Sequence, residues 1–316
     1  MEWIENGTAL AGLPRLCVGC EQLGGVDWGE IDSEELERAM QLAVVRGARF
    51  FDTAGIYGLG ESERRLKGAL SDKRHDQFIA TKGGLVVKAV SDGQRATVVK
   101  NATGESLRRC VNESLERLEV ERIPLFYIHW PDPTTPLSES AAELKALKEE
   151  GLVEHVGLSN FSLEDLKRIN NIVPISAVQI PGNYLSPPDH TILDYCQKQA
   201  ISVCVYGVLA QGLLTGKYSK ATRFDESDRR HRLQHFSQDA WDTNDAKLSL
   251  FFEVAGRVQR PPVQVAIRCL LQTPGVSSVV VGIKSQVQLE ECLAALDWRL
   301  PESELNDLYG AHPGYQ

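Results

Sequence analysis

Eight short apolar segments recur along this chain, and most are followed by a longer segment with the polar and apolar spacing of an amphipathic helix. Short runs rich in Val, Ile, Leu and Phe are typical of strands that are buried on both faces of a parallel sheet. The predicted strands are Arg15–Gly19, Phe50–Asp52, Phe78–Thr81, Pro124–His129, His155–Ser159, Ala177–Ile180, Ser202–Tyr206 and Ser277–Val281. This alternation predicts an α/β protein with a (β/α)8 TIM barrel, and a doubly wound open sheet is the alternative.

The predicted helices carry the residues that usually start and stop helices. Ser33 is the expected N-cap of the first helix, Gly151 ends another, and Ser162 with Asp165 resembles a capping box. The predicted helices are Ser33–Arg46, Glu61–Leu70, Thr103–Leu118, Leu137–Glu150, one that starts at Ser162, His190–Gln199, Pro262–Leu271, Ser285–Leu296 and Glu302–Tyr309. No linker-like segment divides the chain, so we expect residues 1–316 to form a single domain.

Three long loops account for the length of the chain. Barrels of this type have about 250 residues, whereas this chain has 316. The surplus falls after the first, third and seventh strands, in Cys20–Asp32, Gly83–Ala102 and Gly212–Asp245. Such loops are often functional lids, and surface decoration is the alternative. The third loop contains four arginines that either decorate it or contact a phosphate or nucleotide-sugar substrate, namely Arg223, Arg229, Arg230 and Arg232.

The composition argues against several classes of protein. The chain has 34 Lys and Arg against 43 Asp and Glu, a net charge of −9, so we expect no nucleic-acid partner. No run of about 18 uncharged apolar residues is present, and the acidic first residues do not resemble an export signal, so we expect no membrane contact. Seven thinly spread cysteines are typical of reduced thiols in a cytoplasmic enzyme. We interpret Cys17 and Cys20 as packing residues rather than a redox pair, and a monomer is the default expectation.

Ionisable side chains recur at the carboxyl ends of the predicted strands, where barrels place their catalytic groups. Asp52 ends the second strand and Lys82 follows the third, so the two are expected to pair. Tyr57 lies on a glycine-rich turn, and a neighbouring ammonium would lower the pKa of its phenol from about 10. His129 would hydrogen-bond a substrate oxygen. Each residue alone could be structural, but their joint placement favours a catalytic site.

Motifs over nearly the whole chain, in order and in spacing, resemble those of the aldo-keto reductases. They are DTAGIYGLGESE at Asp52–Glu63, TKGG at Thr81–Gly84, IHW at Ile128–Trp130, GLSNF at Gly157–Phe161, LAQGLLTGKY at Leu209–Tyr218 and GIKS at Gly282–Ser285. The resemblance implies a (β/α)8 barrel that interconverts carbonyls and alcohols with NAD(P)H.

The resemblance also implies roles for the site residues. Tyr57 would be the general acid, Lys82 would lower its pKa, and Asp52 would hold Lys82. His129 would orient the substrate oxygen and assist proton transfer. The implied cofactor-binding residues are Ser159, Asn160 and Gln179 at the nicotinamide carboxamide, Tyr206 stacked on the nicotinamide ring, and Leu209, Gln211, Gly212, Lys217, Gly282, Lys284, Ser285, Gln288 and Glu291 along the rest of the molecule.

A phosphate site is expected at the helix that follows the eighth strand. A full G-x-G-x-x-G after the first strand is missing, so a nicotinamide enzyme needs another site for phosphate. Lys284 and Ser285 lie at that helix N-terminus, and a cation with a hydroxyl suits a ribose 2′-phosphate. NADPH is therefore expected, with NADH possible, and a surface lysine beside a helix cap is the structural alternative. No cluster with metal-ligand spacing is found, so we expect no metal.

The substrate is constrained least. Cys20, Trp28 and Trp130 are expected to line its pocket, although either tryptophan could equally belong to the core. Two departures from the family stand out, because Glu21 would place a charge near the nicotinamide and Cys292 stands where relatives often have Asn. We expect a small-molecule carbonyl or sugar substrate. A cofactor-binding regulatory subunit and a barrel isomerase or lyase without a redox step are the alternatives.

Overall fold

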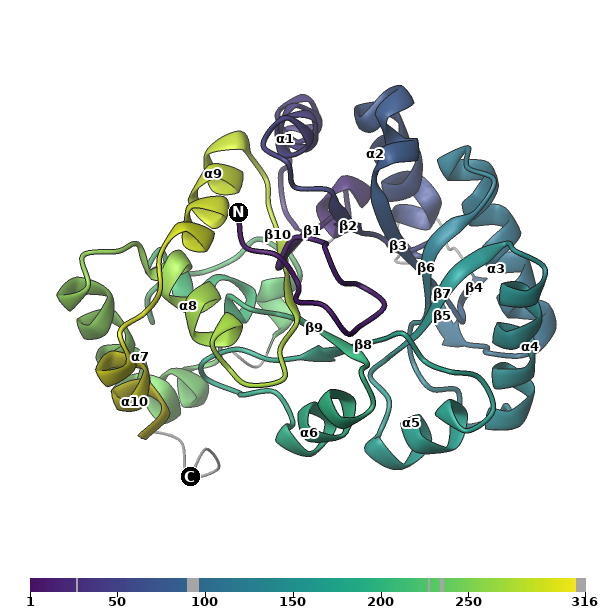
Figure 1. Cartoon of the computed structure of the whole chain (residues 1–316). Helices are drawn as coiled ribbons and strands as arrows, with labels where there is room; N and C mark the ends of the chain where they lie inside the picture. Colours follow the sequence, from purple (N-terminus) through teal and green to yellow (C-terminus); the bar gives the residue numbers. More distant parts are fainter. Residues whose placement is uncertain (27, 90–96, 227, 234–235, 311–316) are drawn as a thin grey trace.

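Eight parallel strands form a closed barrel in the computed structural model, which describes residues 1–310 except 27, 90–96, 227 and 234–235 (Figure 1). The strands are β1 (Leu16–Gly19), β2 (Phe50–Asp52), β3 (Phe78–Gly83), β6 (Ile123–Ile128), β7 (Val153–Ser159), β8 (Ala177–Pro181), β9 (Ser202–Tyr206) and β10 (Ser278–Gly282). Their order is β1-β10-β9-β8-β7-β6-β3-β2, and pairing of β2 with β1 closes the ring. The predicted (β/α)8 barrel is confirmed, and the doubly wound sheet is wrong.

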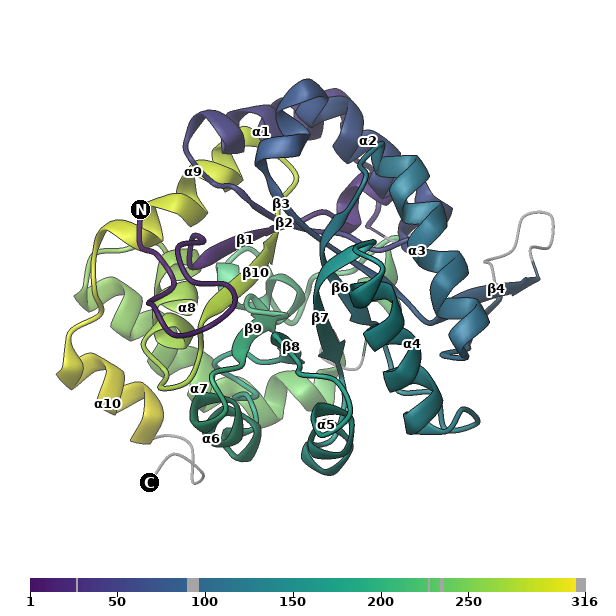
Figure 2. The ribbon, with the colours of Figure 1, turned by 45° about the vertical axis from the view of Figure 1, so that its right-hand side comes forward.

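Helices surround this barrel, as Figures 1 and 2 show. They are α1 (Ser33–Val45), α2 (Glu61–Leu70), α3 (Gly104–Leu118), α4 (Leu137–Glu149), α5 (Leu163–Asn170), α6 (His190–Lys198), α7 (Gln238–Arg257), α8 (Pro262–Leu271), α9 (Gln286–Ala294) and α10 (Glu302–Gly310). The N-cap of α1 is Asp32 rather than the predicted Ser33, because the Asp32 carboxylate accepts a hydrogen bond from the Glu35 amide. In the part of the chain that the structure describes, no helix combines the length and apolar character needed to cross a membrane.

Two of the predicted loops contain regular structure. Segment Gly83–Ala102 includes an antiparallel hairpin of β4 (Leu85–Ala89) and β5 (Thr97–Lys100), which projects from the barrel beside α3 (Figure 2). Its paired valines favour strands, and the prediction of an irregular loop overlooked them. The segment after β9 contains the start of α7, a helix absent from the prediction. The first two turns of α7 are mainly polar except for the buried Trp241, and most of its buried apolar residues come later, at Leu248, Phe251 and Val254 among others.

Apolar side chains fill the inside of the barrel. Phe50, Leu125 and Tyr127 belong to this interior cluster and are almost fully buried. Cys17 and Cys20 are free thiols that are buried as well, so the interpretation of both as packing residues is confirmed. Because the described interior is filled by side chains, it leaves no room for a ligand inside the barrel.

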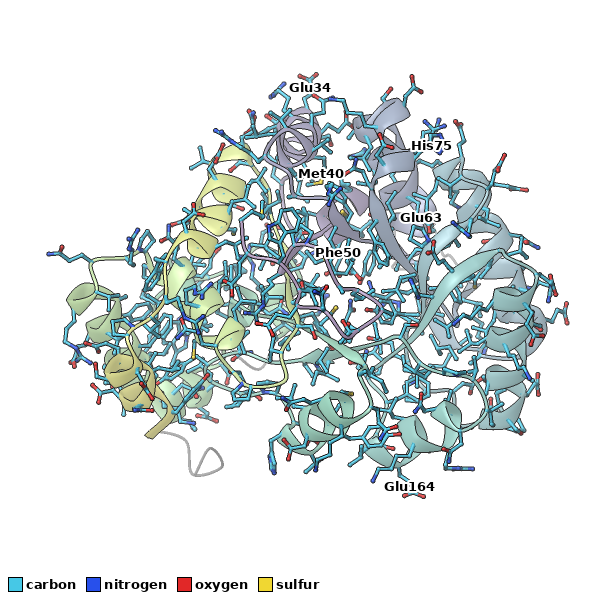
Figure 3. The ribbon with its side chains drawn as sticks, in the orientation of Figure 1. Glu34, Met40, Phe50, Glu63, His75 and Glu164 are labelled. Atoms are coloured by element: carbon cyan, nitrogen blue, oxygen red, sulfur yellow. The ribbon has the colours of Figure 1, made fainter. Side chains whose placement is uncertain are left out.

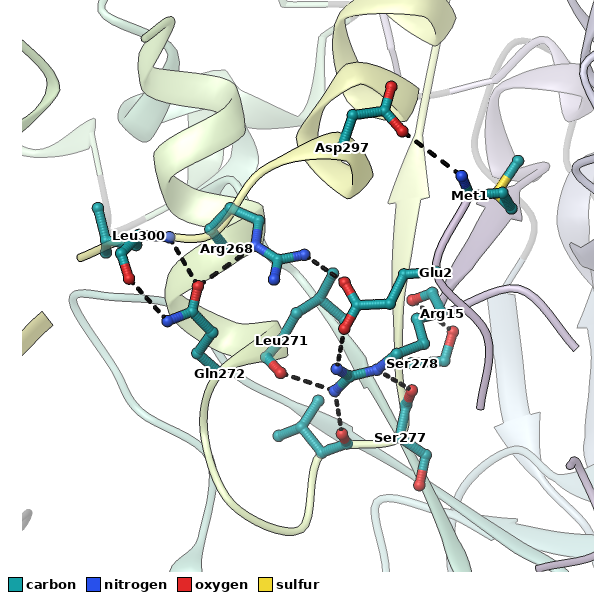
Figure 4. Close-up of polar contacts among 11 residues, drawn as sticks. Met1, Glu2, Arg15, Arg268, Leu271, Gln272, Ser277, Ser278, Asp297 and Leu300 are labelled. Atoms are coloured by element: carbon teal, nitrogen blue, oxygen red, sulfur yellow. Dashed lines mark hydrogen bonds and ion pairs between the residues drawn. The ribbon is translucent and has the colours of Figure 1, made fainter. Parts of the chain in front are cut away.

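An ion-pair network closes the end of the barrel at which the strands begin (Figure 4). The Glu2 carboxylate accepts hydrogen bonds from Arg15, at 2.7 Å, and from Arg268, whose side chain is fully buried. Arg15 also donates to the carbonyl oxygens of Leu271 and Val276, both at 2.7 Å. In barrels of this type this end serves stability rather than catalysis. Glu2 therefore neutralises two arginines where the barrel is sealed.

Candidate active site

The carboxyl ends of the strands surround a cavity of about 470 Å³, within the range of about 300–1,000 Å³ that ligand pockets occupy. The predicted site residues that line it are Cys20, Trp28, Asp52, Tyr57, His129, Trp130, Ser159, Asn160, Gln179, Tyr206, Leu209, Gln211, Gly212, Lys217, Gly282, Lys284, Gln288 and Glu291. Two predicted residues, Lys82 and Ser285, are not part of this lining. The structure thus brings most of the predicted site residues together around one cavity.

Lys82 is buried behind Tyr57 and makes three hydrogen bonds. Its ammonium donates to Asp52 Oδ1 at 2.5 Å, to the Thr53 carbonyl oxygen at 2.9 Å and to the Tyr57 hydroxyl at 3.3 Å. The Lys82 side chain is 0% exposed and that of Asp52 is 6% exposed. Burying either charge alone would be energetically costly, and the ion pair compensates both charges. The predicted pairing of Asp52 and Lys82 is confirmed, and it brings the ammonium to the phenol.

The Tyr57 phenol stays protonated in this environment. Burial raises its pKa well above the ordinary value, and the Lys82 ammonium opposes that effect without cancelling it. Lys82 thus acts in the predicted direction, but burial penalises the phenolate more than Lys82 stabilises it. The pKa of Lys82 is raised, since Asp52 and Tyr57 outweigh the effect of burial. A protonated phenol beside a fixed cation can give up a proton as negative charge develops next to it.

His129 faces Tyr57 across the cavity wall. The two rings lie at right angles with centroids 5.7 Å apart. Burial, and next the Lys82 ammonium, lower the pKa of His129 well below its usual value, so the imidazole is neutral. Its Nδ1 atom is buried without a hydrogen-bond partner among the described residues. A neutral imidazole can donate one hydrogen bond, which suits a substrate oxygen placed between it and Tyr57.

Amide and hydroxyl groups gather beside this pair. The Tyr206 hydroxyl donates to Asn160 Oδ1 at 2.7 Å, and Asn160 Nδ2 donates to the His129 carbonyl oxygen and to Ser159 Oγ, both at 3.0 Å. Asn160 adopts a φ of 66°, a left-handed conformation that Asn tolerates better than most residues. Gln179 Nε2 donates to Asp52 Oδ2 at 2.7 Å, which couples this group to the Lys82 anchor.

The far end of the cavity begins at the N-terminus of α9. Ser285 caps this helix, because its hydroxyl accepts a hydrogen bond from the Gln288 amide. The hydroxyl accepts in the cap and keeps its own hydrogen to donate, so the expected contact of Ser285 with a phosphate stays a prediction. Lys284 does line the cavity, where its ammonium donates to the Trp28 carbonyl oxygen. Burial and the neighbouring Arg230 lower the pKa of Lys284.

Two long loops meet over the cavity mouth. Arg229, from the loop after β9, pairs with Glu21 and lies 4.3 Å from the centre of the Trp28 ring. Arg229 and Arg230 line the cavity, so two of the four arginines predicted in this loop reach the site. Trp130 lies at the rim, 38% exposed, with the Lys100 ammonium 5.3 Å from its ring.

Sequence reasoning missed part of the wall. The missed residues include Gln22, Thr215, Tyr218 and Val263. Thr215 and Tyr218 lie within a motif that was recognised, so their position offered a signal. Gln22 lies in Cys20–Asp32, one of the three long loops singled out from the sequence, whereas Val263 carried no signal. Within the described residues, no group of three His, Cys, Asp or Glu side chains has the arrangement of a metal site.

The family model of the Aldo/keto reductase family matches residues 15–311. The glycerol dehydrogenase AKR11B4 of Gluconobacter oxydans has a similar structure, with a TM-score of 0.87 and 31% identity over 98% of this chain and 96% of that one. The chain belongs to the aldo-keto reductase family. It is accordingly an NAD(P)H-dependent oxidoreductase that interconverts carbonyls and alcohols of small molecules.

Curated relatives are similar to this chain over most of their own length. Aldo-keto reductase YhdN of Bacillus subtilis is 28% identical over 298 residues, which cover 93% of this chain and 88% of the relative. Aldo-keto reductase yakc [NADP(+)] of Schizosaccharomyces pombe is 24% identical over 302 residues, covering 94% of this chain and 87% of the relative. The resemblance seen in the sequence motifs is confirmed, and with it the fold that those motifs imply.

Proposed function

We propose that this aldo-keto reductase uses NADPH and that Tyr57 is its general acid and base. The observation that carries the proposal is the buried chain from Asp52 through Lys82 to the Tyr57 hydroxyl, which ends in the cavity opposite a neutral His129. The bound nicotinamide would supply or accept the hydride. Residues 1–316 would form one domain, and the enzyme would be a monomer. A cytoplasmic location is in keeping with the seven free cysteines.

The polar wall fits a dinucleotide of this kind. Ser159, Asn160 and Gln179 offer donors and acceptors to a carboxamide, and Tyr206 offers an aromatic face at the end of β9. Lys284 offers a cation at the opposite end of the cavity, and Ser285, next to it in the chain, would offer a hydroxyl hydrogen to the same phosphate. The remaining proposed cofactor contacts are Leu209, Gln211, Gly212, Lys217, Gly282, Gln288 and Glu291.

In carbonyl reduction, the Tyr57 hydroxyl donates its proton to the substrate oxygen. Lys82 stabilises the phenolate that is left, and Asp52 keeps Lys82 charged and in place. His129 donates a hydrogen bond to the same oxygen and orients it. In alcohol oxidation the Tyr57 phenolate accepts the proton instead. Cys20, Trp28 and Trp130 border the space left for a carbonyl or sugar substrate.

A screen of aldehydes, ketones and sugars with NADPH, NADH and their oxidised forms tests this proposal. We expect turnover of at least one carbonyl or alcohol in the screen. We expect NADPH or NADP⁺ to be used more efficiently than NADH or NAD⁺, which lack the 2′-phosphate. If the chain binds NADPH tightly but turns over none of these compounds, the proposal of an active enzyme is wrong, and the chain is a cofactor-binding regulatory subunit of the same fold.

Replacement of Lys284 tests the choice of cofactor. Loss of its charge from a 2′-phosphate contact in Lys284→Ala is expected to raise the Kd for NADPH by about 10-fold, the scale of a charge-assisted hydrogen bond, and to leave the Kd for NADH unchanged. Fluorescence titration measures both constants. Lys220→Ala, which removes an exposed cation paired with Asp242, is the matched control. An equal increase in the Kd values for NADPH and NADH would show that Lys284 does not contact the 2′-phosphate.

The direction of the pH dependence follows from the raised pKa of Tyr57. Reduction needs the protonated phenol, so its kcat is expected to stay level through about pH 6–8 and to fall only at alkaline pH. Oxidation needs the phenolate, so its kcat is expected to rise with pH. Steady-state rates in both directions measure this, and a reduction rate that falls through neutral pH would contradict the assignment.

A further inference from the structure

The turn that carries Tyr57 has an unusual backbone. Within η2 (Tyr57–Gly60), Gly58 and Leu59 have φ angles of 58° and 56°, in the left-handed region that disfavours a leucine. Leu59 is 44% exposed, so it contributes little packing that could hold the turn. A strained backbone persists where neighbouring structure fixes it, and such segments cluster at active sites. The groups on either side of this turn therefore determine where the Tyr57 hydroxyl lies.

Backbone packing fixes one side of the turn. A Cβ atom added to Gly58 would lie only 2.3 Å from the carbonyl oxygen of Gly24. Gly24 belongs to η1 (Glu21–Gly24), which follows β1. This contact leaves the turn no room to move towards η1.

The Arg117 side chain borders the other side. A Cβ atom added to Gly60 would lie 2.5 Å from Arg117 Nε, and one added to Gly55 would lie 3.2 Å from Arg117 Nη1. The guanidinium thus lies against both ends of the turn. Beside it is a second cavity of about 320 Å³, lined by Ile56, Leu59, Lys82 and Arg117 among others. The turn could move into this space if the guanidinium did not border it.

Arg117 is itself held rigidly. Its Nη1 donates to Glu63 at 3.1 Å and its Nη2 to Glu113 at 2.6 Å. The Glu63 side chain is 0% exposed and also accepts a hydrogen bond from Thr81 Oγ1 at 2.7 Å, next to Lys82 in β3. Figure 3 shows Glu63 within the molecule, whereas the carboxylates of Glu34 and Glu164 point outward. A buried carboxylate and a planar, forked guanidinium are suited to fixing a position.

We propose that Arg117 is a positioning residue for the oxidoreductase reaction, because it bridges Glu63 and the turn Gly55–Gly60 and thereby keeps the Tyr57 hydroxyl within reach of Lys82. The inference rests on the proposed role of Tyr57. Lys82 is immobilised by Asp52 and the Thr53 carbonyl oxygen, so its 3.3 Å separation from the Tyr57 hydroxyl depends on the position of the turn. A turn that relaxes into the second cavity lengthens this separation.

The test compares Arg117→Ala and Arg117→Lys with the unchanged enzyme. Arg117→Ala is expected to lower kcat for carbonyl reduction by about 10-fold or more and to leave the Kd for NADPH within about twofold, since Arg117 does not line the cofactor cavity. The alkaline limb of the pH profile should move to higher pH, because a more distant Lys82 lowers the pKa of Tyr57 less. A purely structural defect would reduce the amount of folded enzyme without moving that limb.

Arg117→Lys keeps a charge opposite Glu63 but loses the planar fork that reaches both ends of the turn. This variant should fold and show the same shift of the alkaline limb to higher pH. If Arg117→Ala does not fold, the pH profile of Arg117→Lys tests the positioning role instead. Arg108→Ala is the matched control, because Arg108 lies on the same helix but pairs with Glu143 and Glu150 on α4 and the residue after it. It should keep both kcat and the pH profile.

Tyr57→Phe, measured alongside, separates failure of this inference from failure of the proposed function. Full turnover in Tyr57→Phe would show that Tyr57 is not the general acid, and the inference about Arg117 would then be wrong as well. If Tyr57→Phe loses turnover while both Arg117 variants keep kcat within twofold and the limb unmoved, the positioning role of Arg117 is overturned and the role of Tyr57 stands.

Discussion

Replacing Tyr57 with Phe is expected to lower kcat by about 10²–10⁴-fold, the usual contribution of a positioned proton donor. The ring remains and the Asp52–Lys82 pair is untouched, so the cavity keeps its shape. The substituted chain should bind NADPH with a Kd within about twofold of the original value. A loss confined to kcat indicates an interaction made in the transition state.

Consumption of the reduced cofactor with an active carbonyl measures kcat, and fluorescence titration measures the Kd. Tyr195→Phe is the matched control, because it removes a hydroxyl that contacts Asn170 and lies outside the cavity lining. It should turn over normally. Undiminished turnover in Tyr57→Phe would exclude this residue as the proton donor, and loss of NADPH binding would assign it to the cofactor site.

Replacing Glu2 with Ala is expected to lower the free energy of unfolding by about 2–3 kcal/mol. The substitution leaves the fully buried Arg268 without its carboxylate, and the penalty is reduced from the value for a wholly buried pair because Glu2 is 25% exposed. For a chain of this size that corresponds to a melting temperature lower by about 3–5 °C. Thermal unfolding measures the effect, and turnover at low temperature should be unchanged. Glu5→Ala, at an exposed position, should unfold as the original does.

The same pair gives stability a defined pH dependence. Burial raises the pKa of Glu2, but Arg268 and Arg15 outweigh it and hold that pKa below its usual value. A carboxyl with a lowered pKa contributes its full stability above the unfolded-state pKa of about 4.3 and loses it as the pH falls through the folded value. The difference in stability between the original chain and Glu2→Ala should therefore shrink in acid. A difference that is constant with pH would show that the charge of Glu2 is not involved.

The barrel was predictable because most residues of its strands are buried, so the strands read as short apolar runs. The hairpin and the start of α7 were not predicted, because both lie in segments that were assigned to loops by their length. In α7 most of the apolar side chains that pack, such as Phe251 and Val254, lie beyond a beginning in which Trp241 is the buried exception. Ser285 was assigned to phosphate, yet its position before α9 suits an N-cap equally well.

The catalytic candidates were predictable because they end or closely follow apolar strands. Lys82 and Asp52 lie on neighbouring strands, and strand order is what brings them together. The contacts that hold them were not predictable from spacing. Gln179 meets Asp52 across 127 positions of sequence, and Arg117 meets Glu63 across 54. Such contacts depend on how helices and strands pack, which local patterns do not specify.

A crystal structure of the chain with NADP⁺ would test the central proposal most directly. We expect the nicotinamide ring against Tyr206, its carboxamide at Ser159, Asn160 and Gln179, the 2′-phosphate at Lys284, and the Tyr57 hydroxyl facing the carbon that exchanges hydride. A dinucleotide bound outside this cavity, or a nicotinamide turned away from Tyr57, would contradict the account.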